Sequence, residues 1–242
     1  MTHDAGTAGA PVPVLLAWSG GKDAAWALHV LRECPDVAVV GLLTTVAREQ
    51  GRASMQGVRR EVLHAQARAA GLPLIEAAIP AQCANADYEQ AMADALALAA
   101  ARWPGLCTVA FGDLLLEDIR AYRVHSLARI GWKALTPLFG RDTAALAREM
   151  IVGGLRADLC CVDTRQLDIG FASRAFDAAL LADLPAGVDP CGENGEFHTC
   201  VQAGPMFSAP LPLARGATEL RDGRFAYTDF ALAEDAMQLS RP

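Results

Sequence analysis

The run Val14-Leu15-Leu16-Ala17-Trp18 leads directly into Ser19-Gly20-Gly21-Lys22-Asp23, and an apolar helical pattern then continues to about Arg32. A short apolar run of this kind is typical of a parallel strand that is covered on both faces. Two glycines let the backbone turn tightly and approach an anion, and the first N–H groups of a helix are unpaired donors. The stretch therefore predicts a strand, a phosphate-binding turn and a helix.

The residue types in this turn indicate which phosphate group it suits. Lys22 is followed by Asp23 rather than by Ser or Thr, and no glycine stands five positions before Gly21, so the turn is not a mononucleotide P-loop. It is not a dinucleotide fingerprint either. A Ser hydroxyl, a Lys ammonium and a carboxylate that can hold Mg²⁺ suit a pyrophosphate bound with its metal. The residues leave open the alternative that Ser19 or Asp23 only caps the helix.

Beyond the turn, strand and helix patterns alternate as far as about Leu135, and the pattern changes past Pro137. Such alternation predicts βαβ units, and hence an α/β fold with a parallel sheet. We expect a flexible tail over 1–11, a nucleotide-binding domain over 12–140 and a smaller α+β domain over 141–242. The strands expected after the first are Val37–Thr44, Leu74–Ala78, Thr108–Phe111, Lys133–Leu135, Ala157–Val162, Phe197–Gln202 and Phe225–Thr228. The helices expected after the first are Val58–Ala70, Tyr88–Arg102, Ile119–Ile130, Thr143–Val152 and Arg174–Ala182.

Composition narrows the class of protein. The 242 residues are 52% hydrophobic and 20% charged, which indicates a globular chain with a large core. A net charge of −7 argues against nucleic acid as the main partner. Seven cysteines without a Cys-x-x-Cys pair favour reduced thiols in a cytoplasm. The start of the chain has no basic n-region and its apolar run is too short to cross a membrane, so we expect a soluble cytoplasmic protein.

A second polar stretch, Asp189-Pro190-Cys191-Gly192-Glu193-Asn194-Gly195-Glu196-Phe197-His198-Thr199, precedes a predicted strand. Its glycines allow positive φ angles, so it predicts a tight loop that presents polar groups. The residues alone leave two interpretations open, a solvated hairpin turn and a functional site.

Two motifs carry a resemblance to known families. Ser-Gly-Gly-Lys-Asp after the first strand resembles the pyrophosphate loop (PP-loop) of the N-type ATP pyrophosphatases, whose usual motif ends in Ser where this chain has Ala24. Gly-Glu-x-Gly-Glu-Phe-x-Thr over residues 192–199 resembles the C-terminal hallmark of the diphthine–ammonia ligase family, and its form here resembles the bacterial branch. Residues 54–58 resemble a further family motif, with Gln56 where His is expected, and residues 111–113 and 163–168 also fit.

The resemblance, which runs from about Val14 to Gln202, implies a fold and an activity. The fold is a five-stranded parallel sheet of the adenine nucleotide alpha hydrolase (HUP-like) type with a second, smaller α+β domain. The activity is that of an ATP-dependent ligase: ATP adenylates a carboxylate on a small molecule or protein, and ammonia then displaces AMP to leave an amide. The bacterial form implies an acceptor other than diphthine. The acceptor, the ammonia source and the oligomeric state stay open, and a homo-oligomer is compatible with the sequence.

The resemblance also implies roles for single residues, with Mg²⁺ held by Asp23. Catalytic roles go to Lys22, Glu196 and His198. The residues expected to bind ATP are Ser19, Gly20, Gly21, Lys22, Asp23, Gly112 and Asp113. The residues expected to bind the acceptor are Gly192, Glu193, Asn194, Gly195, Glu196, Phe197 and Thr199.

Two alternative functions come from other classes. The departures at Ala24 and Gln56 keep open an adenine-nucleotide sensor or binding protein without turnover. A tRNA-modifying adenylase is the other alternative, and the acidic charge and the unpaired cysteines weigh against it.

Overall fold

The computed structural model of the chain describes residues 10–53, 56–80 and 84–233. Most of the tail predicted over 1–11, and Ser54 and Met55 of the motif at 54–58, lie outside the described residues.

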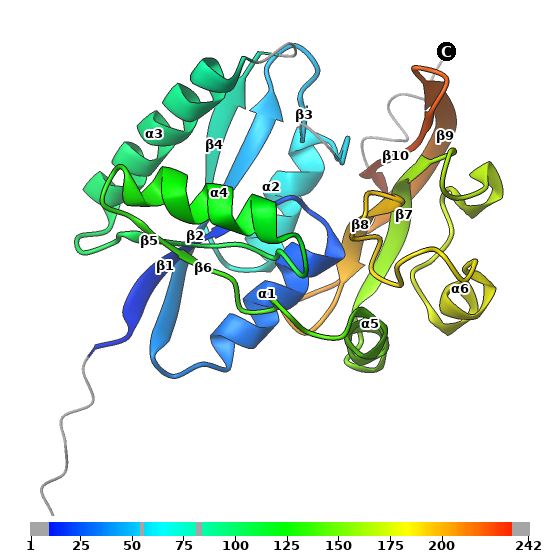
Figure 1. Cartoon of the computed structure of the whole chain (residues 1–242), viewed down its shortest axis with the longest axis horizontal. Helices are drawn as coiled ribbons and strands as arrows, with labels where there is room; N and C mark the ends of the chain where they lie inside the picture. The colour runs from blue at the N-terminus through cyan, green and yellow to red at the C-terminus, as the bar shows by residue number, and fades with distance from the viewer. Residues whose placement is uncertain (1–9, 54–55, 81–83, 234–242) are drawn as a thin grey trace, which may run out of the picture.

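The first half of the chain forms a mostly parallel sheet (Figure 1). Five strands pair in parallel in the order β4-β2-β1-β5-β6, and the short β3 pairs antiparallel with β2, which makes six strands in all. The predicted five-stranded sheet is therefore correct in its parallel strands but omits β3. The strands are β1 (Val12–Ala17), β2 (Val37–Ala47), β3 (Arg52–Ala53), β4 (Leu74–Ile79), β5 (Thr108–Ala110) and β6 (Lys133–Leu135).

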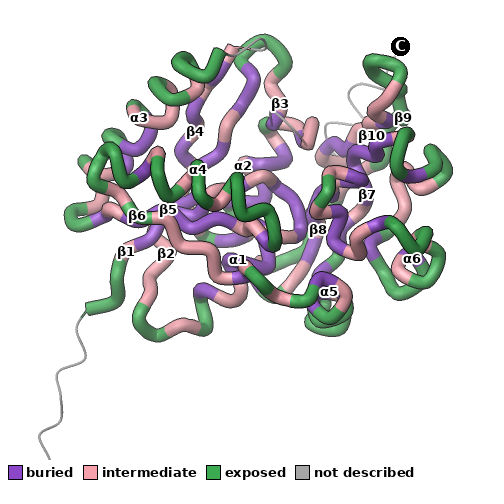
Figure 2. The backbone as a smooth tube through the Cα atoms, in the orientation of Figure 1, coloured by how far each residue is buried: buried purple, intermediate pink, exposed green. Residues whose placement is uncertain are grey.

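Helices cover both faces of this sheet. Alternate residues of β1 face opposite ways: Leu15 packs in one apolar cluster with α3 and α4, whereas Val14 and Leu16 pack in another with α1 and α2. In Figure 2 the strands of this sheet are mainly purple and pink and α1 is mainly purple, whereas α3 and α4 are largely green. These helices are α1 (Lys22–Arg32), α2 (Arg60–Ala69), α3 (Asn85–Arg102) and α4 (Glu117–Ala128). None of the helices in the described ranges is long and apolar enough to cross a membrane.

The second half forms a separate antiparallel sheet with the strand order β8-β7-β10-β9. One apolar cluster contains residues of β1, α1 and α2 together with Leu159, Phe197 and Phe230 of this sheet, so the two halves share a core. The elements are α5 (Thr143–Val152), β7 (Arg156–Asp163), the short 3-10 helix η1 (Ile169–Phe171), α6 (Ala178–Asp183), β8 (Phe197–Ala203), β9 (Leu213–Arg221) and β10 (Phe225–Leu232).

Two elements of the second half differ from the sequence prediction. The helix expected over Arg174–Ala182 begins only at Ala178, because Phe176 donates a backbone hydrogen bond to Ala157 and Asp177 caps the helix through Leu180 N. The strand β9 was not predicted. Most of its side chains are exposed, so it lacks the apolar alternation that marks a half-buried strand.

Candidate functional site

A cavity of about 700 Å³ opens at the carboxyl ends of β1, β2 and β5 and is closed on one side by the loop before β8. The strand order reverses between β1 and β5, and ligands of open α/β sheets bind at such a point. Both sequence motifs line this cavity, although they lie far apart in the chain. Of the predicted site residues, all line it except Gly20 and Glu196; the lining ones are Ser19, Gly21, Lys22, Asp23, Gly112, Asp113, Gly192, Glu193, Asn194, Gly195, Phe197, His198 and Thr199.

The glycine loop between β1 and α1 is held from outside. Gly20 has a φ of 81°, and a Cβ atom there would come within 2.9 Å of both Gln66 and Leu63. The side chain of Gln66 is fully buried; it donates to the carbonyls of Gly20 and Val201 and accepts from Trp18 Nε1. The loop is therefore fixed by α2 and β8 in a conformation that favours glycine.

Lys22 is the first residue of α1 and joins the two motifs. Its backbone N–H donates to Thr199 Oγ1 at 3.0 Å, and its ammonium donates to the carbonyl of Cys191 and to Asp23. The ammonium also lies 5.7 Å and 5.5 Å from the ring centres of Phe176 and Phe197. Burial is the largest single influence and opposes the charge, but Asp23, Cys191 and Glu193 together outweigh it, so the pKa of Lys22 is raised. Only 2% of Lys22 is exposed, so its charge is confined beneath the second loop.

Asp23 supplies the one carboxylate at the start of α1. Its Oδ2 is 2.8 Å from Lys22 Nζ, whereas its Oδ1 is buried and has no hydrogen-bond partner among the described residues. Burial raises the pKa of Asp23, and Lys22 acts in the opposite direction. A buried carboxylate oxygen without a partner is costly, and a cation bound there would offset that cost.

Gly112 and Asp113 follow β5 at the same edge of the sheet. A Cβ atom on Gly112 would come within 2.7 Å of the backbone of Asp23, so the two loops can meet only if this residue is glycine. Asp113 Oδ2 lies 2.8 Å from Arg123 Nε without the alignment of a hydrogen bond. Burial raises the pKa of Asp113 even though Arg123 lowers it, and the charge of Asp23 adds to the rise.

Glu196 holds the second loop together and does not reach the cavity. Its carboxylate is 1% exposed and accepts hydrogen bonds from the backbone of Asp189 and from the backbone and side chain of Asn194. Asp189 in turn accepts from the backbone of Cys191 and Glu193. These bonds hold the Glu196 carboxylate within the loop, and Glu196 is not among the residues that line the cavity.

Glu193 connects the second loop to the segment after β5. Its Oε1 accepts from the backbone N–H groups of Leu114 at 3.1 Å and Leu115 at 3.0 Å. Burial raises the pKa of Glu193, although the two backbone bonds oppose the rise. Glu193 therefore forms part of the cavity wall and fixes its far side.

His198, on β8, lines the cavity and is half-buried. Burial, followed by the charge of Lys22, lowers the pKa of His198 to about 4. The ring is therefore neutral near pH 7, and a neutral imidazole has one nitrogen that can accept a proton or a hydrogen bond.

Several lining or supporting residues were not predicted from the sequence. Thr44 and Thr45 lie in the carboxyl-terminal part of β2 and line the cavity, and the rule that ligands bind at the carboxyl ends of parallel strands could have found them. No sequence pattern marked the roles of Arg123, Gln66 and Phe176. An Arg or Gln on a helix is usually solvated, and a Phe usually packs in the hydrophobic core.

Comparison with known proteins gives two matches. Residues 142–225 match the family model described as the diphthamide synthase C-terminal domain. A diphthine–ammonia ligase of Schizosaccharomyces pombe is 27% identical over 229 aligned residues, which cover 86% of this chain and 37% of the yeast protein. The chain thus spans well under half the length of this relative. Together with the motifs, the two matches support the diphthine–ammonia ligase family for this chain.

Proposed function

We propose that the chain is an ATP-dependent ligase that forms an amide from a carboxylate and ammonia and releases AMP and pyrophosphate. The similarity to a diphthine–ammonia ligase supports this activity at the level of the family. The observation that carries the proposal is the contact between Lys22 N and Thr199 Oγ1, which unites the two motifs around one cavity. The parallel strand order also supports a sheet of the adenine nucleotide alpha hydrolase type.

ATP and Mg²⁺ fit the residues at the first loop. A cavity of about 700 Å³ has the size of a nucleotide site. Ser19, Gly21 and the charge of Lys22 would hold the phosphates, and Asp23 Oδ1 would hold Mg²⁺. Mg²⁺ usually takes one or two protein carboxylates together with substrate phosphates, which this single buried oxygen can satisfy. When bound, the metal supplies neutralisation of the phosphate charge.

The proposed reaction has two steps, adenylation of the acceptor and amide formation. A carboxylate oxygen of the acceptor attacks the α-phosphorus, and the bond from that phosphorus to the bridging oxygen breaks to release pyrophosphate. The nitrogen of ammonia then attacks the carbonyl carbon of the mixed anhydride, the bond to AMP breaks, and the nitrogen loses a proton. His198 is neutral and faces the cavity, so it can accept the hydrogen bond of the attacking ammonia and guide that proton toward water.

The second loop would orient the acceptor through groups other than Glu196. Glu193, Asn194 and the backbone of Gly192 and Gly195 line the cavity, whereas Glu196 positions them from behind. The form of this loop favours the bacterial branch, and with it an acceptor that differs from diphthine.

One observation favours a second candidate, a nucleotide-binding protein without turnover. Ala24 and Gln56, the two positions that depart from the family motifs, both line the cavity. A tRNA-modifying adenylase with thiolate chemistry is disfavoured, since burial raises the pKa of Cys161 to about 11 and those of Cys191 and Cys200 to about 12.

ATP–pyrophosphate exchange, screened over a panel of carboxylate metabolites, tests the proposal. We expect label to pass into ATP only when the correct acid is present, and AMP to be the nucleotide product in the presence of ammonia. Asp23→Asn is the inactive control, and Asp118→Asn, on the exposed side of α4, is its matched partner. ATP binding without exchange for any acid supports the second candidate, and ADP as the main product overturns the proposal.

A further inference from the structure

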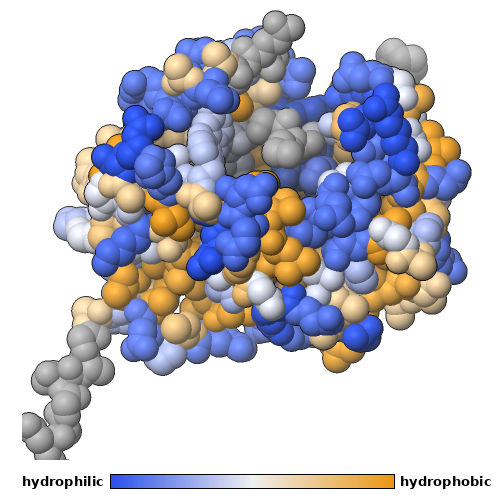
Figure 3. Space-filling model, viewed as in Figure 1, coloured by the Kyte–Doolittle hydropathy of each residue, from blue (hydrophilic) through white to orange (hydrophobic). Residues whose placement is uncertain are grey.

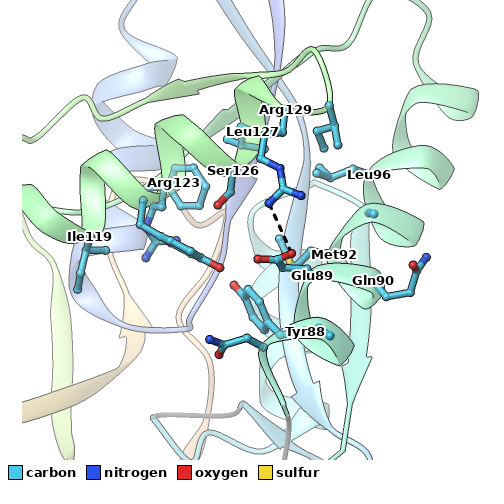
Figure 4. Close-up of a pocket in the computed structure, with 16 residues that line it drawn as sticks. Tyr88, Glu89, Gln90, Met92, Leu96, Ile119, Arg123, Ser126, Leu127 and Arg129 are labelled. Atoms are coloured by element: carbon cyan, nitrogen blue, oxygen red, sulfur yellow. Dashed lines mark ion pairs between the residues drawn. The ribbon is translucent and has the colours of Figure 1, made fainter.

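A second cavity, of about 660 Å³, lies between α3 and α4 (Figure 4). Side chains of α4, including Ile119, Ser126 and Leu127, face Tyr88 and Met92 of α3 across it. Arg129, which follows the last residue of α4, forms an ion pair at 3.9 Å with Glu89 of α3. The groove has the volume of a small-molecule site and a mainly apolar lining.

This groove is continuous with the candidate active site. The residues that line both cavities are Tyr88, Met92, Phe111, Ile119 and Arg123. A molecule in the groove could therefore extend its end into the cavity where the α-phosphate of ATP is proposed to lie.

Apolar side chains on and just after α4 line the groove but are not covered by the rest of the described protein. Among the described residues, Leu127 is the one member of α4 that is buried. Ile119, Tyr122 and Ile130 line the groove and yet stay 41%, 48% and 48% exposed. Figure 3 shows apolar residues exposed on the face of the molecule that carries α4. An apolar ligand in the groove would remove this surface from water, which is favourable.

Arg123 places a positive charge at the junction of the two cavities. Its guanidinium lies 4.2 Å from the ring centre of Phe111, which fixes its plane, and its Nε faces Asp113 at 2.8 Å. A guanidinium has five N–H donors in a fork that matches a carboxylate, so its terminal nitrogens can bind a second anion. Among the described residues, Asp113 is the one carboxylate within ion-pair distance of Arg123.

We propose that the α3–α4 groove binds the body of the acceptor and that Arg123 holds its carboxylate beside the nucleotide. The acceptor is then an acid with an apolar or aromatic body, and this assignment rests on the proposed ligase function. A positive charge at the junction lowers the repulsion between the acceptor carboxylate and the phosphates, which must meet before adenylation.

The test uses the full chain with two probes that share a phenylpropyl body, the anion 4-phenylbutyrate and the neutral 4-phenylbutan-1-ol, whose affinities are measured by ligand-observed NMR. We expect the acid to bind about tenfold or more tightly than the alcohol. Arg123→Met should abolish this preference. Arg120→Met, on the same helix but outside both cavities, should retain it. Equal affinity of the acid and the alcohol for the unmodified chain overturns the proposal.

One variant that fills the groove, compared with a control variant on the same helix, shows where the probe binds. Ser126 lines only the groove, and Val124 lies on α4 outside both cavities. Ser126→Trp should weaken 4-phenylbutyrate binding about tenfold or more and leave ATP affinity, measured by calorimetry with Mg²⁺, within about threefold. Val124→Trp should change neither affinity. Unaltered acid binding in a folded Ser126→Trp variant overturns the groove assignment, whereas a chain that binds the acid but not ATP overturns only the ligase function.

Discussion

The two polar loops that meet at the cavity are stabilised in opposite ways. The glycine loop is held by residues distant in the sequence: Gln66 and Val201 bind Gly20, and Thr199 binds the backbone of Lys22. The loop at 189–196 is held mainly by its own residues, with Glu196 accepting three hydrogen bonds from within it. The first loop keeps a buried Asp23 oxygen unpartnered, whereas the second uses its most buried carboxylate on itself. A conspicuous polar residue in a motif can therefore either face a bound ligand or hold the loop that lines the binding site.

The largest effect on stability is expected at Lys22, whose ammonium group binds both loops. Lys22→Met keeps the length of the side chain but leaves Asp23 and the carbonyl of Cys191 without their donor. Removing one partner of a buried ion pair should lower the free energy of unfolding by about 3 kcal/mol. Urea denaturation measures the change. Lys133→Met, at the other lysine of the chain, which is exposed, should change it by less than about 0.5 kcal/mol.

The next effect distinguishes the carboxylate of Asp23, which has an unpartnered oxygen, from that of Glu196, which is bonded within its own loop. ATP with Mg²⁺ at about 100 times its dissociation constant should stabilise the unmodified chain by about 2.7 kcal/mol. Asp23→Asn should remove most of this gain, because the buried oxygen that would hold the metal loses its charge. Thermal unfolding with and without ATP and Mg²⁺ gives the difference. An equal gain in the variant would show that Asp23 is not the metal ligand.

Glu196→Gln tests the other side of the comparison. The amide nitrogen of Gln cannot accept from Asn194 N, so we expect a loss of about 2 kcal/mol in the free energy of unfolding. ATP affinity should stay within about a few-fold, because the side chain does not line the cavity, while amide formation should fall as the loop loosens. Glu219→Gln, on exposed β9, is the matched control for stability. A tenfold loss of ATP affinity at unchanged stability would assign Glu196 to the nucleotide.

The smallest effect concerns His198 and pH. A histidine whose pKa falls from 6.5 to about 4 on folding is protonated in the unfolded chain but not in the native one between these values. Lowering the pH from 7 to 5 therefore destabilises the protein through this residue. We expect about 1 kcal/mol after allowance for its partial exposure. His198→Gln should lose this part of the pH dependence, and His125→Gln, on exposed α4, should keep it, as read by denaturation at both pH values.

The sequence alone determined most of the helices and strands and the glycine turn between the first strand and the first helix. The apolar run before Ser19, the glycines after it and the regular alternation that follows are local signals. Strand and helix periodicity, and the tight turn that two consecutive glycines allow, depend on neighbouring residues, so they can be predicted without the fold. The same signals failed for β9, whose pairing with β10 is made by the backbone and leaves no apolar pattern in its side chains.

The tertiary structure alone decided what each polar side chain contacts. Lys22 turns under the second loop, Glu196 turns into it, and Arg123 reaches the junction of the two cavities. The placement of Lys22 depends on partners from a distant segment, such as Thr199, which is 177 residues away. The partners of Glu196 lie in its own loop. Burial then fixes the charge state, because the cost of removing a charged group from water depends on packing that no local pattern encodes.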